Sequence, residues 1–316
     1  MSFTKYKTIF ILIFIFCTPK EDEYNYKNFI MGGPCEIKFY TSDKKLARMI
    51  LSEINSDLKY LDSLLNYFSP NSLVSKINRE HRAQLPKDIK PVFLLSDSIS
   101  RLTNGAFDIS IAPLLEIWGF YSNQKKIPAQ VEINRAKRFV DYRKITLKRD
   151  SIFIPDSMKI DLGGIAQGFA ADWVAGIMKK YKIKSAIINI AGEVYALGKS
   201  PKNRPWIIGI KNPRGEGIIE KVDLIDDALS TSGDYEKFFV VDGIRYAHII
   251  DPKTGYPAKN YASVTIFAES ATFADGIATA VSVMGAQEGK EFLDSLGIKG
   301  IIYYEHENRL ERLETK

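Results

Sequence analysis

Asp275 and Thr279 are two oxygen-bearing side chains whose spacing points to chemistry. They stand four residues apart within 270–285, a stretch that begins with an N-cap serine and ends with a glycine, and is therefore predicted to be a helix. Residues four apart share a helix face, and the rest of this face carries only small residues, so something can approach it closely. Hard cations prefer oxygen ligands. The pair is a candidate metal site, with ordinary helix packing as the alternative.

A pair of glycines, Gly163 and Gly164, lies between a predicted strand at 158–162 and a predicted helix. Backbone N–H groups at a helix start attract phosphate, and glycine lets the phosphate come close. A plain tight turn is the alternative. Asp161, at the end of the strand, suits a ribose or a ring N–H, or else a simple cap. The Gly164 carbonyl is a third oxygen that a divalent cation could use.

His248 lies at the end of a predicted strand, before a rigid turn at 251–257. Functional side chains favour such places, and a histidine can take a proton from a hydroxyl. With an ordinary pKa near 6.5, its activity as a base would fall as the pH drops through that value. A structural role is the alternative. The chain has only three histidines, which argues against a zinc enzyme.

Residues 1–17 have the pattern of a lipoprotein signal peptide. Lys5 and Lys7 precede an apolar run at 9–16, which is too short to span a bilayer as a stable helix. Cys17 at the end of that run predicts lipidation, although Phe16 replaces the small residue usual before such a cysteine. A buried N-terminal strand is the alternative. The pattern predicts an exported protein anchored to a membrane.

The rest of the chain is predicted to be a polar tether at 18–27 followed by one folded domain at 28–316. If Cys17 is lipidated, Cys35 is the only remaining thiol, and no disulfide can form. The net charge of +6 is scattered among acidic residues, which gives nucleic-acid binding little support. With 45% apolar residues the chain can build a full core.

The apolar periodicities predict an α+β fold, with mixed and antiparallel sheets and hairpins flanked by helices. Helices are expected at 43–65 and 87–103, and a strand–helix–strand unit is expected over 158–190. Asp242-Gly243 predicts a two-residue hairpin turn. The other expectations are a strand at 29–40 interrupted by Gly32-Gly33, turns at 66–78, a short helix within 122–141, a surface location for the final dozen residues, and strands at 145–147, 151–154, 206–210, 217–222, 263–267 and 301–304.

Seven short motifs occur in the order and spacing of the ApbE family, and this resemblance covers roughly residues 28–310. The family consists of FAD:protein FMN transferases, once called thiamine-biosynthesis lipoproteins. The resemblance implies an exported, Mg²⁺-dependent enzyme that splits FAD, releases AMP and joins FMN through a phosphoester bond to a Thr or Ser of a partner protein. The motifs begin at Met31, Ser69, Gly105, Asp161, Asn189, His248 and Ala274.

The resemblance also implies roles by position. His248 matches the general base. The metal would be held by the side chains of Asp275 and Thr279 and by the carbonyls of Gly164 and Ala278. FAD would be contacted at Met31, Phe68, Ala106, Phe107, Asp108, Asp161, Gln167 and Ile250.

Three positions depart from the family pattern. Gln167 replaces a common Lys or Glu, Gly33 replaces a usual Thr, and Ala191 replaces a usual glycine. None belongs to the metal set, so we expect effects on rate and FAD affinity rather than on the type of reaction.

Three functions fit these residues. The first is the transferase, acting on a membrane or exported redox protein from a lipid anchor that faces the periplasm, at the bacterial inner membrane. The second is an FAD pyrophosphatase, because water can replace the acceptor hydroxyl. The third is a non-enzymatic, membrane-anchored FAD-binding protein, which would not need a metal set beside His248.

Overall fold

The protein is described from a computed structural model, and the description covers residues 21–122 and 124–315. The predicted signal peptide and Cys17 lie outside the described residues. Within the described ranges, no helix combines the length and the apolar character that crossing a membrane requires.

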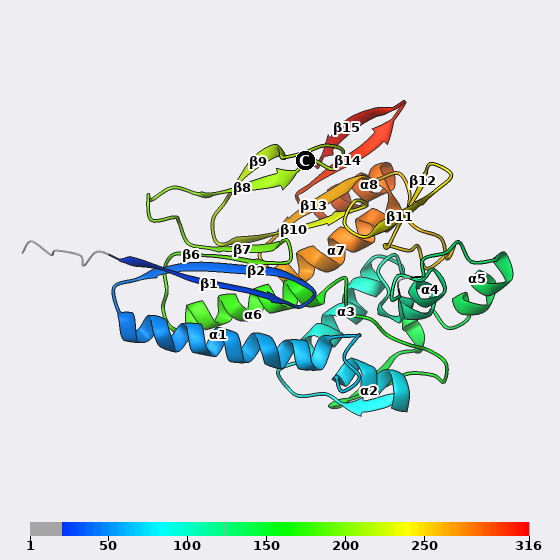
Figure 1. Cartoon of the computed structure of the whole chain (residues 1–316), viewed down its shortest axis with the longest axis horizontal. Coiled ribbons are helices and arrows are strands. Elements are labelled where there is room, and N and C mark those ends of the chain that lie inside the picture. The colour runs from blue at the N-terminus through cyan, green and yellow to red at the C-terminus, as the bar shows by residue number, and fades with distance from the viewer. Residues whose placement is uncertain (1–20, 123, 316) are drawn as a thin grey trace, which may run out of the picture.

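An eight-stranded sheet organises the fold (Figure 1). Every neighbouring pair in it is antiparallel, so the predicted α+β class is confirmed. The strands, in spatial order, are β1 (Asp22–Ile30), β2 (Gly33–Thr41), β6 (Ala186–Ile190), β7 (Glu193–Leu197), β10 (Asp227–Gly233), β13 (Ser263–Ala268), β14 (Gly300–His306) and β15 (Arg309–Glu314).

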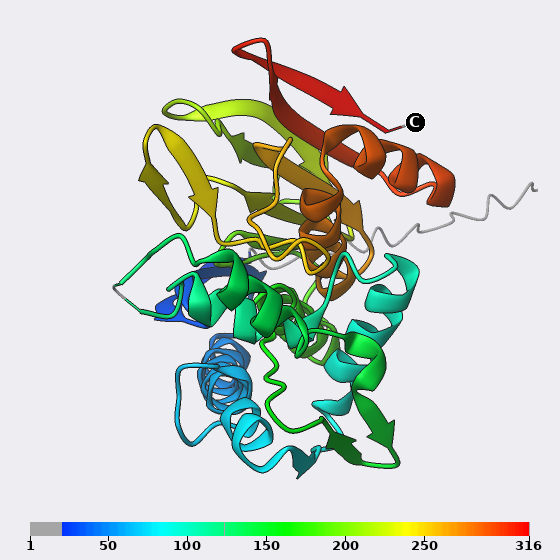
Figure 2. The same ribbon diagram turned by 90° about the vertical axis from the view of Figure 1, so that its right-hand side faces the viewer.

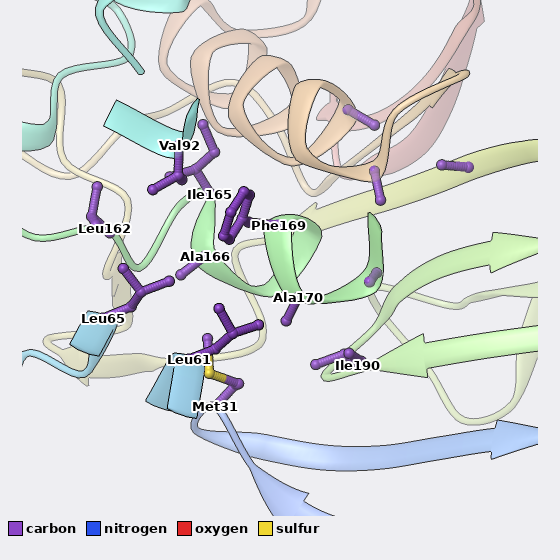
Figure 3. Close-up of a cluster of buried hydrophobic side chains, with 14 of the residues drawn as sticks. Met31, Leu61, Leu65, Val92, Leu162, Ile165, Ala166, Phe169, Ala170 and Ile190 are labelled. Carbon is purple, nitrogen blue, oxygen red and sulfur yellow. The ribbon is translucent and has the colours of Figure 1, made fainter. Parts of the chain in front are cut away.

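Helices α1 (Lys44–Leu65), α6 (Ala166–Lys180) and α7 (Ala271–Met284) cover one face of this sheet, and the hairpin of β8 (Trp206–Lys211) and β9 (Ile218–Leu224) covers the other (Figure 1). The main core lies on the helical side, where apolar residues of the sheet meet those of the helices. Figure 3 shows this core close to the start of α6, with residues of α1 facing it. The cluster includes Met31, Leu61, Leu65, Ile165 and Phe169.

The predicted helices form for the expected reasons. In α1, Asp43 caps the N-terminus by accepting from Lys45 and Leu46 backbone N–H groups, and the predicted apolar stripe is buried apart from its first residue. In α7, the Ser270 hydroxyl accepts from the Phe273 N–H at 3.2 Å, and the helix ends at Gly285. The predicted boundaries of α7 are therefore confirmed.

Smaller units surround the helical side (Figure 2). One of them packs α4 and α5 around Trp118, whose indole donates to the Gly255 carbonyl at 2.9 Å. The predicted hairpin around Asp242-Gly243 is confirmed as β11 and β12. These units comprise α2 (Leu73–Glu80), β3 (Arg82–Gln84), α3 (Lys90–Leu102), α4 (Ala112–Ile117), α5 (Gln130–Lys137), β4 (Thr146–Lys148), β5 (Ser151–Phe153), β11 (Phe238–Val241), β12 (Ile244–Ala247) and α8 (Ala286–Leu296), with short 3-10 turns at Ile109–Ile111 and Tyr142–Lys144.

The predicted tether is wrong over residues 22–27, which belong to β1. Alternate aromatic side chains of this polar stretch are half-buried, and Tyr24 stacks on Phe39 of β2 with ring centroids 5.6 Å apart. The expected single strand at 29–40 is a hairpin, because the chain reverses at Met31 and Gly32, both with positive φ. In the sequence, the charged residues of β1 obscured the alternation of exposed and half-buried side chains that is typical of a strand.

The predicted strand at 158–162 is absent, and with it the strand–helix–strand unit at 158–190. Side-chain hydrogen bonds replace the ladder there. The Asn78 side chain accepts from the Ile160 N–H at 2.7 Å and donates to the Ile160 carbonyl at 2.9 Å. The sequence pattern does not predict α2 in the turn-rich segment, nor β3, β7, β10 and α8, and the residues of β15 were expected only at the surface.

Candidate active site

All the predicted site residues except Ala278 line one cavity of about 280 Å³, which we call the main cavity. Its walls come from the turn after β1, the start of α6, one face of α7, and the region of β11 and β12. Residues far apart in the sequence are thus brought together. These lining residues are Met31, Phe68, Ala106, Phe107, Asp108, Asp161, Gly164, Gln167, His248, Ile250, Asp275 and Thr279.

The small residues of α7 serve helix packing as well as the cavity. The backbone N–H of Gly168, in the first turn of α6, donates to the Asp275 carboxylate at 3.0 Å. A Cβ atom on Gly168 would lie 2.8 Å from the Asp275 Cβ, closer than such atoms approach in practice. The packing interpretation of this face is therefore confirmed, because α6 packs on it. The metal site stays a prediction, and both Asp275 and Thr279 line the cavity.

Gly164 and Thr279 meet across the cavity wall. The Thr279 hydroxyl lies 3.4 Å from the Gly164 carbonyl oxygen, and a Cβ on Gly164 would lie 2.9 Å from that hydroxyl. Glycine is thus required for this close approach. The Gly164 carbonyl, which the sequence offered as a third oxygen beside Asp275 and Thr279, therefore lies next to the Thr279 hydroxyl.

Asp275 is 5% exposed, and burial raises the pKa of its carboxyl to about 7. One oxygen accepts from the Gly168 N–H, which leaves the other for a ligand. A buried carboxylate beside a hydroxyl and a carbonyl oxygen fits a hard cation such as Mg²⁺, whose charge would offset the burial. The described residues hold no group of three or more His, Cys, Asp or Glu side chains suited to a metal. The donor set here is instead a mixture of oxygen types.

Ala278 is the exception among the predicted ligands. Its side chain is buried, it does not line the main cavity, and its carbonyl accepts the Ser282 hydroxyl at 2.8 Å. Its place among the metal ligands stays a prediction.

Glu193 is a cavity residue to which the sequence analysis assigned no role. It begins β7, is 7% exposed, and its Oε2 atom has no hydrogen-bond partner among the described residues. Burial, followed by the charge of Asp275, raises the pKa of Glu193 well above its usual range. Its position in the motif that begins at Asn189 was the available signal. A cation bound at this wall would favour the ionised form of both Glu193 and Asp275.

His248 faces the same cavity from the strand end, as predicted. Its backbone N–H donates to the Lys237 carbonyl at 2.9 Å, and its Nδ1 atom is enclosed with no hydrogen-bond partner among the described residues. Removal of the ring from water, followed by the nearby charge of Lys237, lowers the pKa of His248 to about 4. The imidazole is therefore neutral at pH 7, which is the form that can act as a base. The pKa of His248 is therefore lower than the ordinary value near 6.5 that the sequence predicted.

Lys237 is a second residue that the sequence analysis missed. Within the described chain it is the only Lys or Arg that lines the main cavity. It precedes β11, and its carbonyl bond to His248 places it beside the histidine. A lysine at this point supplies a positive charge for phosphate oxygens. The signal for it was the predicted hairpin, which pairs this segment with the one that carries His248.

Phe68 presents an aromatic surface at the mouth of the main cavity, with 64% of its side chain exposed. Tyr67 and Tyr121 stack with ring centroids 4.1 Å apart, and Phe68 packs edge-on against both. The Tyr121 hydroxyl also donates to Asp161. Such a cluster suits a flat aromatic ligand. Tyr121 was not predicted as a site residue.

The carboxylates of Asp108 and Asp161 organise their own loops. Asp108 accepts from the Ser110 N–H at 2.8 Å and from the Tyr142 N–H at 2.9 Å. Asp161 accepts from the Gly163 N–H at 2.8 Å. With these bonds and the one from the Tyr121 hydroxyl to Asp161, each oxygen of the two carboxylates has a partner within the protein.

The three departures from the family pattern lie together around the turn after β1. The Gln167 side chain donates to the Met31 carbonyl at 3.1 Å and so holds the turn. A Cβ on Gly33 would lie 2.5 Å from the Ala191 Cβ. A larger residue at position 33 and alanine at position 191 therefore exclude each other. These two departures compensate for one another.

Comparisons with known proteins identify the family to which the sequence and the fold belong. Residues 31–302 match the sequence profile of the ApbE family. The chain is 32% identical over 255 residues to the FAD:protein FMN transferase of Haemophilus influenzae, covering 76% of this chain and 73% of that protein. It is 30% identical over 292 residues to that of Vibrio cholerae, covering 88% and 86%. The apo crystal structure of Pseudomonas stutzeri flavinyl transferase ApbE has a TM-score of 0.86 at 27% identity, covering 94% of this chain and 96% of that one. This chain therefore belongs to the ApbE family.

Proposed function

We propose that this chain is a flavin transferase that moves FMN from FAD to a Thr or Ser hydroxyl of a target protein and releases AMP, with Mg²⁺ as its metal. The observation that carries the proposal is the meeting, in one cavity, of the oxygen set on α7 with a neutral histidine. Membership of the ApbE family supports the same reaction. A protein that only stored FAD would need neither feature.

Asp275, Thr279 and the Gly164 carbonyl would hold the metal in this proposal. A bound Mg²⁺ neutralises the charge of a pyrophosphate and so eases attack at phosphorus. Phe68 and its two tyrosine partners would support the flavin ring at the mouth of the cavity. Lys237 would bind phosphate oxygens from the opposite wall.

His248 would act as the general base. A ring nitrogen of the neutral imidazole would accept the proton of the acceptor hydroxyl. The hydroxyl oxygen would form a bond to the FMN phosphorus, and the bond from that phosphorus to the bridging oxygen would break. AMP leaves with the bridging oxygen. The products are AMP and a protein with FMN in phosphoester linkage. If water takes the place of the acceptor hydroxyl, the same steps give free FMN and AMP.

We also propose that the protein is exported and anchored through Cys17, at the inner membrane and facing the periplasm. Because β1 begins at Asp22, residues 18–21 alone separate Cys17 from the sheet. Four extended residues span at most about 14 Å. The active domain would therefore work close to the bilayer, and its target would be a membrane or exported redox protein.

Incubation of the purified protein with FAD, Mg²⁺ and membrane extract tests the proposal. We expect a fluorescent flavin band on a denaturing gel, together with AMP in solution. AMP and free FMN without a band would favour a pyrophosphatase. Intact FAD that remains bound in the presence of Mg²⁺ would favour an FAD-binding protein without activity.

A further inference from the structure

A second cavity of about 250 Å³ adjoins the main cavity at the point where α3, α7 and α8 come together. We call it the acceptor groove. Ala106 and Val283 line both cavities, so the two share part of one wall. Val283 is one helical turn beyond Thr279 on α7. A chain lying in the groove is thus one turn of helix from the proposed metal ligands.

The floor of the acceptor groove is apolar. Leu102, at the end of α3, is 44% exposed, and Met284 and Phe292 are half-buried. These side chains come from three different helices. Methionine adapts its shape to a partner more readily than branched side chains do. The floor can therefore take an apolar side chain from another molecule.

The rim of the groove is polar and charged. Lys253 and Glu288 are exposed there, and neither side chain makes an ion pair or a hydrogen bond with the rest of the described protein. Asn104, also exposed, adds an amide at the end of the turn after α3. An apolar centre with a polar rim is the usual composition of a protein-binding surface.

We propose that the acceptor groove binds the segment of the target protein that carries the flavinylated Thr or Ser. This inference rests on the proposed function, because transfer needs an acceptor hydroxyl to reach phosphorus while FAD fills the main cavity. An apolar side chain next to the acceptor residue packs on Met284 and Phe292. The hydroxyl then passes Val283 toward Thr279, and polar groups of the segment meet Lys253 and Glu288.

A matched pair of substitutions tests the groove. Met284→Lys places a charge on its floor at the C-terminal end of α7, where a cation suits the helix dipole. Leu296→Lys makes the same kind of change at the C-terminal end of α8, at a site that is 43% exposed and lines neither cavity. The probe is the protein that acquires flavin fluorescence in the membrane-extract experiment, purified and supplied at varied concentration.

We expect Met284→Lys to lower kcat/KM for the acceptor roughly 10-fold or more, which is the size of effect seen for a central interface residue. AMP release from FAD without acceptor should stay within about 2-fold of the unchanged protein, since water needs no groove. Leu296→Lys should change neither rate. Glu288→Lys, on the rim, should also lower kcat/KM for the acceptor and leave acceptor-free AMP release unchanged.

Unchanged transfer in both groove variants would overturn the proposal. An equal loss of transfer and of acceptor-free AMP release in both would also overturn it, because the groove would then serve FAD rather than the acceptor. If the unchanged protein releases no AMP and labels no protein, the proposed function itself fails, which is a different result.

Discussion

The α6–α7 wall of the main cavity and the wall formed by β11, β12 and the preceding segment hold their functional groups by different means. On the first wall, Gly164 and Gly168 allow contacts so close that a single Cβ would displace Thr279 or Asp275. On the second wall, the Nδ1 atom of His248 has no hydrogen-bond partner among the described residues. The pKa of this histidine is set by its removal from water and by the charge of Lys237. Close packing therefore fixes the positions of the groups on the first wall, and electrostatics determines the protonation state of His248 on the second.

This difference has a consequence for function. A metal requires fixed oxygen positions, and tightly packed helices supply them. A general base requires a suitable pKa and access for a changing partner, and a hairpin beside the cavity supplies those. We therefore expect substitutions on the first wall to act through geometry and those on the second to act through protonation.

The largest expected effect comes from Asp275→Asn on the packed wall. The amide keeps the size of the side chain and can still accept from the Gly168 N–H, but it removes the negative charge that a metal needs. We expect Mg²⁺-dependent AMP release to fall on the order of 10³-fold or more. The melting temperature without metal should not decrease, because a buried charge is also removed. Near-normal AMP release at low Mg²⁺ would show that the metal lies elsewhere.

His248→Ala is the corresponding change on the other wall. If His248 accepts the proton of the acceptor hydroxyl, flavin transfer should fall on the order of 10²–10⁴-fold. FAD affinity should remain, because other residues hold the nucleotide. Single-turnover transfer and FAD affinity, measured on the same variant, show whether His248 acts as the base or has only a structural role. A parallel loss of affinity and stability would mean that the histidine only braces the hairpin and the turn that follows it.

The pH profile separates the walls without any mutation. Because the pKa of His248 is lowered to about 4, its neutral form persists below 6.5. At Mg²⁺ concentrations that keep Asp275 ionised, the transfer rate should therefore fall only at a pH below that ordinary value. Folding stability should fall over the same range as the pH drops from 6.5 toward 4, since the unfolded chain takes up a proton that folded His248 resists. A midpoint at or above 6.5 in the rate profile would contradict this account.

The smallest expected effect concerns the compensating pair at the turn after β1. Gly33→Thr alone should lower the free energy of unfolding by about 1–3 kcal/mol, because the new Cβ meets Ala191. Adding Ala191→Gly should restore part of that loss. Urea denaturation of the two single variants and the double variant gives the coupling energy. Simple additivity would indicate that the turn rearranges instead of relying on close packing.

The sequence predicted helices better than strands for identifiable reasons. In α1 and α7, a regular apolar period and a capping side chain pointed to the same boundaries. β1 was mistaken for a tether because charged and polar residues occupy most of its exposed positions, while only Tyr24 and Tyr26 alternate inward. The segment at 158–162 imitates a strand, but its backbone pairs with Asn78, a partner that no local pattern reveals.

The cavity residues likewise fall into those that the sequence predicts and those that only the fold reveals. Asp275, Thr279 and His248 could be found from residue type and spacing, and most of the FAD contacts came from the family resemblance. Glu193, Lys237 and Tyr121 were missed, because their roles depend on which segments the fold brings together. The mutual exclusion of bulk at Gly33 and Ala191 likewise exists only in three dimensions.

The most direct test of the account is to measure AMP and protein-bound flavin in the same single-turnover reaction, with FAD, Mg²⁺ and the labelled target protein. We predict that the two products appear together and in equal amounts, and that both are lost in Asp275→Asn. For His248→Ala we predict that protein-bound flavin falls while FAD remains bound. Protein-bound flavin formed without AMP, or formed at a normal rate by Asp275→Asn, would contradict the account.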